Sequence, residues 1–185
     1  CATGSMKKYR NLTAQEIVDQ VDFVLSKREE RFEEAFEHKV NYTRMGSPFL
    51  NLDAVQKAIT AIDIKYPKTH HYISTIGVKG SDFSWIKDNI TLQISVHSLD
   101  ETRRRNLIPF KNLMTLEELG QIRTRSNLKT TINLTLVDFK DFDINKLKTL
   151  FDPKHFFIKL SPINPNEVSE KNGLGLGVVP GINIV

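Results

Sequence analysis

The chain has 185 residues, of which 39% are hydrophobic and 26% are charged, a balance typical of a soluble globular domain and not of a disordered chain. Its one cysteine excludes an intrachain disulfide and fits a reducing compartment, and no apolar run reaches the ~20 residues of a membrane span. The formal net charge of +4 is compatible with an RNA partner but does not require one. We expect a cytoplasmic protein that does not enter a membrane.

The predicted elements alternate between helices and strands. A helix begins at Thr13, which forms a capping box with Glu16, and extends to about Glu37. A strand over 40–45 ends at a glycine, and a second helix opens near Asp53. The later elements are strand 72–76, a short helical stretch around 85–86, strand 91–97, a helix from 115, strand 131–137, helix 144–150 and strand 156–160.

This alternation predicts a parallel sheet with right-handed crossovers, which is either doubly wound or part of a (β/α) barrel. A strand buried on both faces reads as a nearly continuous apolar run. Here the strands alternate, since Ile94 and Val96 share one face while Gln93, Ser95 and His97 share the other. We therefore predict a partial (β/α) barrel of the TIM-barrel-like kind, in which helices cover one face and the polar face lines a ligand site.

Functional groups of (β/α) barrels gather at the carboxyl ends of the strands. A single serine there is usually structural, and one histidine is more often a satisfied core residue than a catalyst, but here several such residues share one location. They can hydrogen-bond an amino acid and a ribose, and they form no obvious acid/base pair or hydrolytic triad. The residues selected by this rule are Gly46, Ser47, Ser74, Thr75, Ser95, His97, Asp138, Ser161 and Asn164.

Cys1 lies in a loop that leads into the first predicted helix. From the residues alone it is either an ordinary free thiol or a thiolate with a metal-binding or nucleophilic role.

Two other groups of residues can be interpreted from the sequence, the first in two ways and the second as structural. The run 103–105 of three arginines either meets phosphate or begins a solvated helix, and His70 and His71 are expected to be structural because they precede the strand at 72–76.

The segment that begins Cys1-Ala-Thr-Gly and continues over 10–20 resembles the radical S-adenosylmethionine (SAM) RNA methyltransferases that modify adenine at carbon 2 or carbon 8. The resemblance covers most of the chain and recurs in the same order at later motifs. These are Met45-Gly46-Ser47-Pro48, Ser74-Thr75-Ile76-Gly77, Ser95-Val96-His97 with the following Asp100-Glu101-Thr102-Arg103, and Pro162-Ile163-Asn164-Pro165.

The resemblance implies that Cys1 is the last of a Cys-x-x-x-Cys-x-x-Cys trio that binds a 4Fe-4S cluster. It also implies an rRNA or tRNA substrate, an electron donor such as flavodoxin or ferredoxin, and a monomer. Residues 1–185 would form one incomplete radical SAM core domain, a fragment whose first strand, two upstream cysteines and C-terminal part lie outside this sequence. The residues implied to bind SAM are Gly46, Ser47, Ser74, Ser95, Val96, His97 and Asn164.

Three departures from the family pattern leave alternatives open. Ser47 replaces a glutamate that would pair with the ammonium of SAM, Lys7-Lys8 replaces Gly-Phe, and Asn133 stands where glutamate is common. One alternative is a divergent radical SAM enzyme with a substrate other than RNA. The other is a (β/α) module that has lost its cluster and binds a nucleotide or RNA without turnover. The substrate, the modified atom and the oligomeric state stay open at this point.

Overall fold

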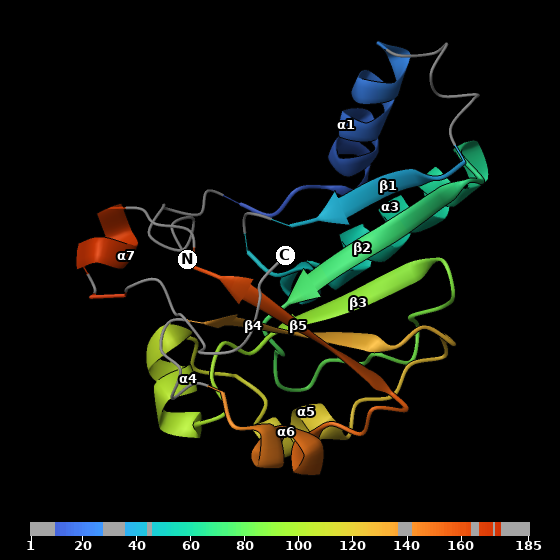
Figure 1. Ribbon diagram of the computed structural model, residues 1–185. Coiled ribbons are helices and arrows are strands. Elements are labelled where there is room, and N and C mark those ends of the chain that lie inside the picture. The colour runs from blue at the N-terminus through green and yellow to red at the C-terminus, as the bar shows by residue number, and fades with distance from the viewer. Residues whose placement is uncertain are drawn as a thin grey trace.

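The computed structural model describes residues 10–27, 36–43, 46–136, 142–163, 167–171 and 173–174. Its strands form one open sheet in which spatial order follows chain order and every neighbouring pair is parallel. Figure 1 shows this curved sheet, with β1 and β5 as its two edges. The predicted partial barrel with parallel strands is confirmed. The strands are β1 (His38–Tyr42), β2 (Thr69–Thr75), β3 (Ile90–Ser95), β4 (Thr130–Leu136) and β5 (Phe156–Pro162).

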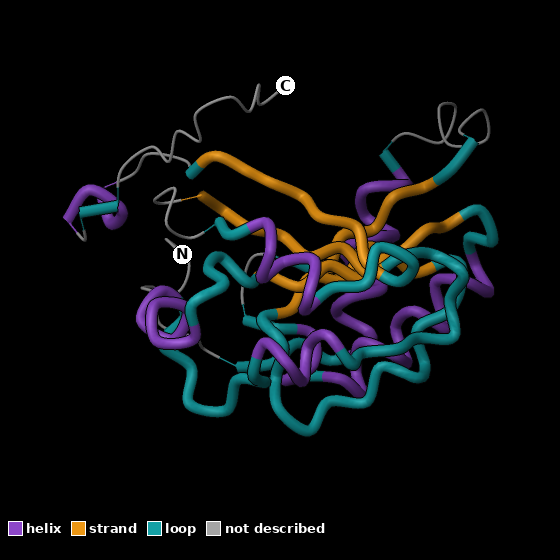
Figure 2. The backbone as a smooth tube through the Cα atoms, turned by 60° about the horizontal axis from the view of Figure 1, so that its bottom comes forward, coloured by secondary structure: helices purple, strands orange, loops and turns teal. Residues whose placement is uncertain are grey.

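Helices follow β1, β3 and β4 and lead into the next strand, and Figure 2 shows most of the helices with the long loops on one side of the sheet. The helices α1 (Ala14–Ser26) and α3 (Leu52–Lys65) also pack on each other, because Val18 of α1 meets Ala58 and Ile62 of α3 in a small buried cluster. The described helices are α1 (Ala14–Ser26), the 3-10 turn η2 (Pro48–Leu50), α3 (Leu52–Lys65), α4 (Glu101–Leu107), α5 (Leu116–Gly120), α6 (Ile144–Leu150) and α7 (Glu167–Lys171).

Two predicted helical elements differ from the structure. The first helix ends at Ser26, whereas the sequence predicted a helix to about Glu37, and residues 28–35 of that interval lie outside the described residues. The helical stretch predicted around 85–86 is wrong, because Asp82 holds a turn there. Its carboxylate accepts hydrogen bonds from the backbone N–H (2.8 Å) and hydroxyl (2.9 Å) of Ser84, and local bonds of this kind compete with helix formation.

The two faces of the sheet have the different characters that the alternation predicted. In β2 the side chains of Ile73 and Thr75 are buried, while those of Tyr72 and Ser74 on the other face are partly exposed. The buried face packs against the helices and forms the core. The opposite face, which carries Tyr72 and Ser74 and is called the inner face below, is polar. Fully buried core residues include Ile73, Ile94, Leu116, Leu119, Ile132 and Leu134.

A buried polar group at the amino end of β2 stabilises the fold. The His71 ring bonds through Nδ1 to the Tyr42 hydroxyl (3.0 Å) and through Nε2 to Asp63 Oδ1 (2.9 Å). Asp63 also accepts hydrogen bonds from Lys87 Nζ (3.1 Å) and Asn89 Nδ2 (2.9 Å). Buried polar atoms need such partners, so this arrangement agrees with the structural role expected of His71.

This histidine is expected to make folding stability depend on pH. Burial lowers the pKa of His71, and the hydrogen bond that the ring donates to Asp63 opposes this shift only in part. The unfolded chain therefore binds a proton near pH 6.5 that the folded chain does not, so stability is complete above that pH and falls as the pH drops towards the folded-state pKa. The fall should reach at most about 1.4 kcal/mol per pH unit.

Urea denaturation between pH 5 and pH 8 measures this dependence. The variant His71→Gln should be less stable at pH 8 and should lose less additional stability on acidification than the parent. His155→Gln is the matched control, because His155 is exposed. A parent and a His71→Gln variant with the same pH dependence would contradict the assignment.

Candidate functional site

The carboxyl ends of the strands bring the predicted polar residues to one edge of the sheet. Ser74 of β2 is in register with Gln93, and Ser95 of β3 is in register with Asn133. Ser74 and Ser95 therefore lie on the same face and near the same end. Figure 1 shows the arrowheads of the strands pointing to this common side.

The β1 and β2 ends are joined by hydroxyl groups. Ser47 Oγ lies 3.0 Å from Thr75 Oγ1, and Thr75 Oγ1 also accepts the backbone N–H of Gly77 at 3.2 Å. Gly46 has a φ of +78°, in the left-handed region that favours glycine, and a β-carbon placed on it would meet no atom of the described residues within 4 Å. The backbone at Gly46 is therefore open to an approaching ligand.

The β3 end turns sharply at His97. This residue has a φ of +65°, which is uncommon for a residue with a side chain, and strain of this kind is often found at functional sites. His97 Nδ1 accepts the backbone N–H of Thr135 at 3.2 Å. Because an accepting Nδ1 carries no proton, the neutral ring carries its proton on Nε2 and can donate from that side. The strand ends at Ser95 rather than at His97 as predicted.

Val96 has a different character from the other candidates. Its side chain is completely buried among the core residues, which leaves only its main chain to contact a ligand. The backbone N–H of Val96 donates to the Asn133 carbonyl at 2.9 Å, so this residue anchors the β3 end to β4.

Asn133 belongs to the site more closely than sequence reasoning indicated. It lies on the inner face, where its Oδ1 accepts the Ser161 hydroxyl at 3.0 Å, and it thereby joins the β4 and β5 ends. Gln93 is a second residue that was not selected, and its amide reaches Ser74 Oγ at 3.5 Å. The alternation within each strand could have identified both, because it places them on the polar face.

Hydroxyl, amide and imidazole groups dominate this edge, and such groups suit a ligand with amino, carboxylate and ribose functions. The nearby carboxylate of Asp100 is used locally, since it caps α4 by accepting the Arg103 N–H at 2.8 Å. Within the described ranges, no group of three or more His, Cys, Asp or Glu side chains could hold a metal ion. Cys1, Asp138 and Asn164 lie outside the described residues.

A cavity of about 680 Å³ adjoins the edge. It lies between α1 and the free edge of β1, and its walls include Ile17, Val21, Val40 and Tyr42. Ser47 also lines it, so the cavity reaches the carboxyl end of β1.

None of the described helices has the length and apolar character that a membrane span requires.

The open parallel sheet defines a protein of the (β/α)-barrel class, and its polar carboxyl edge is the candidate ligand site. Among curated proteins, the probable dual-specificity RNA methyltransferase RlmN of Gloeobacter violaceus is 38% identical over 179 residues, which are 90% of this chain and 50% of that protein. The proteins of the same name from Chlorobaculum tepidum and Pseudothermotoga lettingae are 34% and 29% identical over 74% and 89% of this chain, and over 38% and 50% of their own lengths.

The chain is related to these RlmN-type RNA methyltransferases over most of its own length, as the resemblance of its motifs predicted. It spans about half the length, or less, of these relatives. No family model matches the chain, and no solved structure matches it.

Proposed function

We propose that the intact protein is a radical SAM enzyme that methylates an adenine in ribosomal or transfer RNA. The observation that carries this proposal is the convergence of Ser47, Ser74, Ser95 and His97 at one edge of a parallel sheet, in the chain order of the family motifs. The names of the relatives support an RNA substrate. A flavodoxin or ferredoxin as electron donor, a monomeric state and a cytoplasmic location belong to the same proposal.

In this proposal SAM lies across the carboxyl edge. The open backbone at Gly46 admits the amino acid part of SAM, and the hydroxyls of Ser74 and Ser95 with the His97 imidazole supply hydrogen bonds. The Asn164 amide supplies a further contact. Because Val96 offers only its main chain, its role is limited to a backbone contact.

Cys1 would hold a 4Fe-4S cluster together with two further cysteines, since thiolates are the usual ligands of such clusters. When bound, the cluster supplies the single electron that cleaves SAM. The polypeptide positions the reactants and excludes water around them.

Ser47 gives the site a neutral group where the family has a carboxylate. Its hydroxyl is already bonded to Thr75 at 3.0 Å, so the SAM ammonium would meet a hydroxyl pair instead of a full negative charge. The loss of this charge-assisted hydrogen bond predicts weaker recognition of the ammonium at this position.

Anaerobic iron-sulfur reconstitution of the intact gene product tests the proposal. The reconstituted protein should release 5′-deoxyadenosine from SAM after one-electron reduction, and it should methylate an adenine in unmodified rRNA or tRNA. Release of 5′-deoxyadenosine with no RNA methylation would favour a divergent radical SAM enzyme with another substrate. A protein that binds RNA or a nucleotide and neither assembles a cluster nor cleaves SAM would be the binding module.

Asn164→Ala in the intact protein should weaken SAM binding by about 1–3 kcal/mol, because a polar group of SAM would be left without its partner. Isothermal titration calorimetry with SAM measures this change. Asn145→Ala is the matched control, because Asn145 is exposed on α6. Equal affinities for the parent and the Asn164→Ala variant would contradict the proposed contact.

A further inference from the structure

Arg104 is the only arginine with a completely buried side chain among the described residues. The sequence offered a phosphate contact or a solvated helix start for the run 103–105, and neither interpretation holds for this residue. Arg104 lies in α4, seven residues after the strained backbone of His97. Burying a guanidinium is costly unless it is paired and hydrogen-bonded, so the groups around it indicate its purpose.

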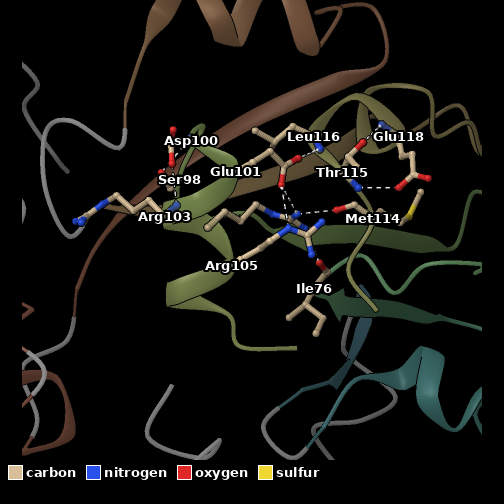
Figure 3. A network of polar contacts seen from close by, with 11 residues as sticks. Ile76, Ser98, Asp100, Glu101, Arg103, Arg105, Met114, Thr115, Leu116 and Glu118 are labelled. Carbon is tan, nitrogen blue, oxygen red and sulfur yellow. Dashed lines mark hydrogen bonds and ion pairs between the residues drawn. The ribbon is translucent and has the colours of Figure 1, made fainter. Parts of the chain in front are cut away.

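The guanidinium bridges two segments that are far apart in the sequence. Its terminal nitrogens donate to the backbone carbonyl of Met114 at 2.6 Å and to that of Ile76 at 3.0 Å. Figure 3 shows Ile76 and Met114 in this network of polar contacts, with Glu101 and Leu116 above them. The first carbonyl lies in the segment before α5, and the second immediately follows β2.

Glu101 supplies the compensating charge. One of its carboxylate oxygens lies 3.8 Å from the Arg104 guanidinium, and the other accepts the backbone N–H of Leu116. The pair therefore ties the start of α5 to α4 as well. Backbone bonds add to the connection, since Met114 N–H donates to the Gly77 carbonyl at 2.9 Å.

These contacts reach the candidate site through a short path. Ile76 directly follows Thr75, whose hydroxyl bonds to Ser47 and to the N–H of Gly77. At the other end, α4 follows the β3 end that carries Ser95 and His97. One side chain thus connects the segment after β2 with the helix after β3.

We propose that Arg104 is a positioning residue that fixes the β2 and β3 ends relative to each other and so shapes the SAM site at their edge. This role rests on the proposed function. A lysine at this position keeps the charge but cannot donate two hydrogen bonds in the fixed geometry of a guanidinium. The β2 end should then lose its fixed position while the charge balance with Glu101 is kept.

Arg104→Lys in the intact protein should raise the KM and Kd for SAM at least tenfold and leave the affinity for RNA within twofold of the parent. Amide hydrogen exchange should become faster at Gly77 and Met114. Arg105→Lys is the matched control, because Arg105 is partly exposed in the same helix and its side chain lies 3.8 Å from Glu101. It should change the Kd for SAM less than twofold.

A second control separates positioning from general stability. Leu147→Ala removes a buried side chain from α6, which lies outside β2 and β3, and should lower the melting temperature. It should leave the Kd for SAM unchanged even where it destabilises as much as Arg104→Lys. If Arg104→Lys does not fold, the double variant Glu101→Gln/Arg104→Met removes both charges, keeps an acceptor for Leu116 N–H and should show the same tenfold loss.

The outcomes are distinct. A parent that binds SAM, with variants at Arg104 whose Kd is unchanged, overturns the positioning role and leaves the proposed function standing. A loss in Arg104→Lys no larger than that in an equally destabilised Leu147→Ala variant also overturns it. A parent that does not bind SAM overturns the proposed function and this role together.

Discussion

Replacement of Cys1 with alanine in the intact protein is expected to abolish the absorbance of the reconstituted 4Fe-4S cluster and the release of 5′-deoxyadenosine together. Three thiolates hold such a cluster and leave one iron open, so the loss of one ligand removes the site and not merely part of its affinity. The visible absorbance of the cluster, the iron content and the amount of 5′-deoxyadenosine released measure the effect.

The control for this variant is Ser5→Ala in the same segment, which should assemble the cluster at the parent level. Circular dichroism should show the same helix content for both variants, because Cys1 precedes the capping box of α1, in which Thr13 and Glu16 bond reciprocally. A Cys1→Ala variant that assembled a redox-active cluster and cleaved SAM at the parent rate would contradict the role given to this cysteine.

Most of the fold could be predicted because its strongest signals are local. The capping boxes of α1 and α5 were visible as Thr13 with Glu16 and Thr115 with Glu118, and both are formed in the structure. The period of two in the strands gave the correct polar face. The helix ends and the turn at Asp82 were predicted less well, because single side-chain bonds to the backbone decide them and periodicity does not record such bonds.

The candidate site was predictable in part for the same reason. Strand ends can be found from the sequence, so Ser74 and Ser95 were selected correctly for the carboxyl edge. The burial of Val96 also followed from the alternation, which places it on the face of Ile94, whereas the resemblance of the motif Ser95-Val96-His97 implied a contact with SAM. The role of Arg104 was not predictable, since its two carbonyl partners, Ile76 and Met114, are 28 and 10 residues away in the chain.

The second large effect is expected at Gly77, where two costs coincide. Its φ of +77° favours glycine, and a β-carbon there would lie 2.6 Å from Leu119 Cδ2. Leu119 is completely buried, so its side chain has little room to move away. The left-handed backbone and the overpacking together predict that Gly77→Ala destabilises the fold by roughly 3 kcal/mol.

Gly80→Ala separates the two costs. Gly80 has a φ of +82°, but a β-carbon on it would meet no atom within 4 Å in the part of the chain that the structure describes, so only the backbone cost of about 1–2 kcal/mol applies. Urea denaturation of both variants at pH 7.5 measures the difference, which reports the contact with Leu119. Equal losses for Gly77→Ala and Gly80→Ala would show that the contact has no energetic consequence.

A double-mutant cycle with Leu119→Ala tests the same contact from the other side. Shortening Leu119 costs about 2–5 kcal/mol by itself, because it leaves a cavity in the core. In the presence of Gly77→Ala, the same change also removes the clash, so the double variant should be more stable than the sum of the single losses by about 1 kcal/mol or more. Because the clash with Leu119 should displace the backbone N–H that Gly77 donates to Thr75 at the candidate site, Gly77→Ala should also weaken SAM binding, and Gly80→Ala should not. Two results together would contradict the tight packing of Leu119 on the β2 end. The losses of stability in Gly77→Ala and Leu119→Ala would be additive, and Gly77→Ala and Gly80→Ala would reduce the affinity for SAM equally.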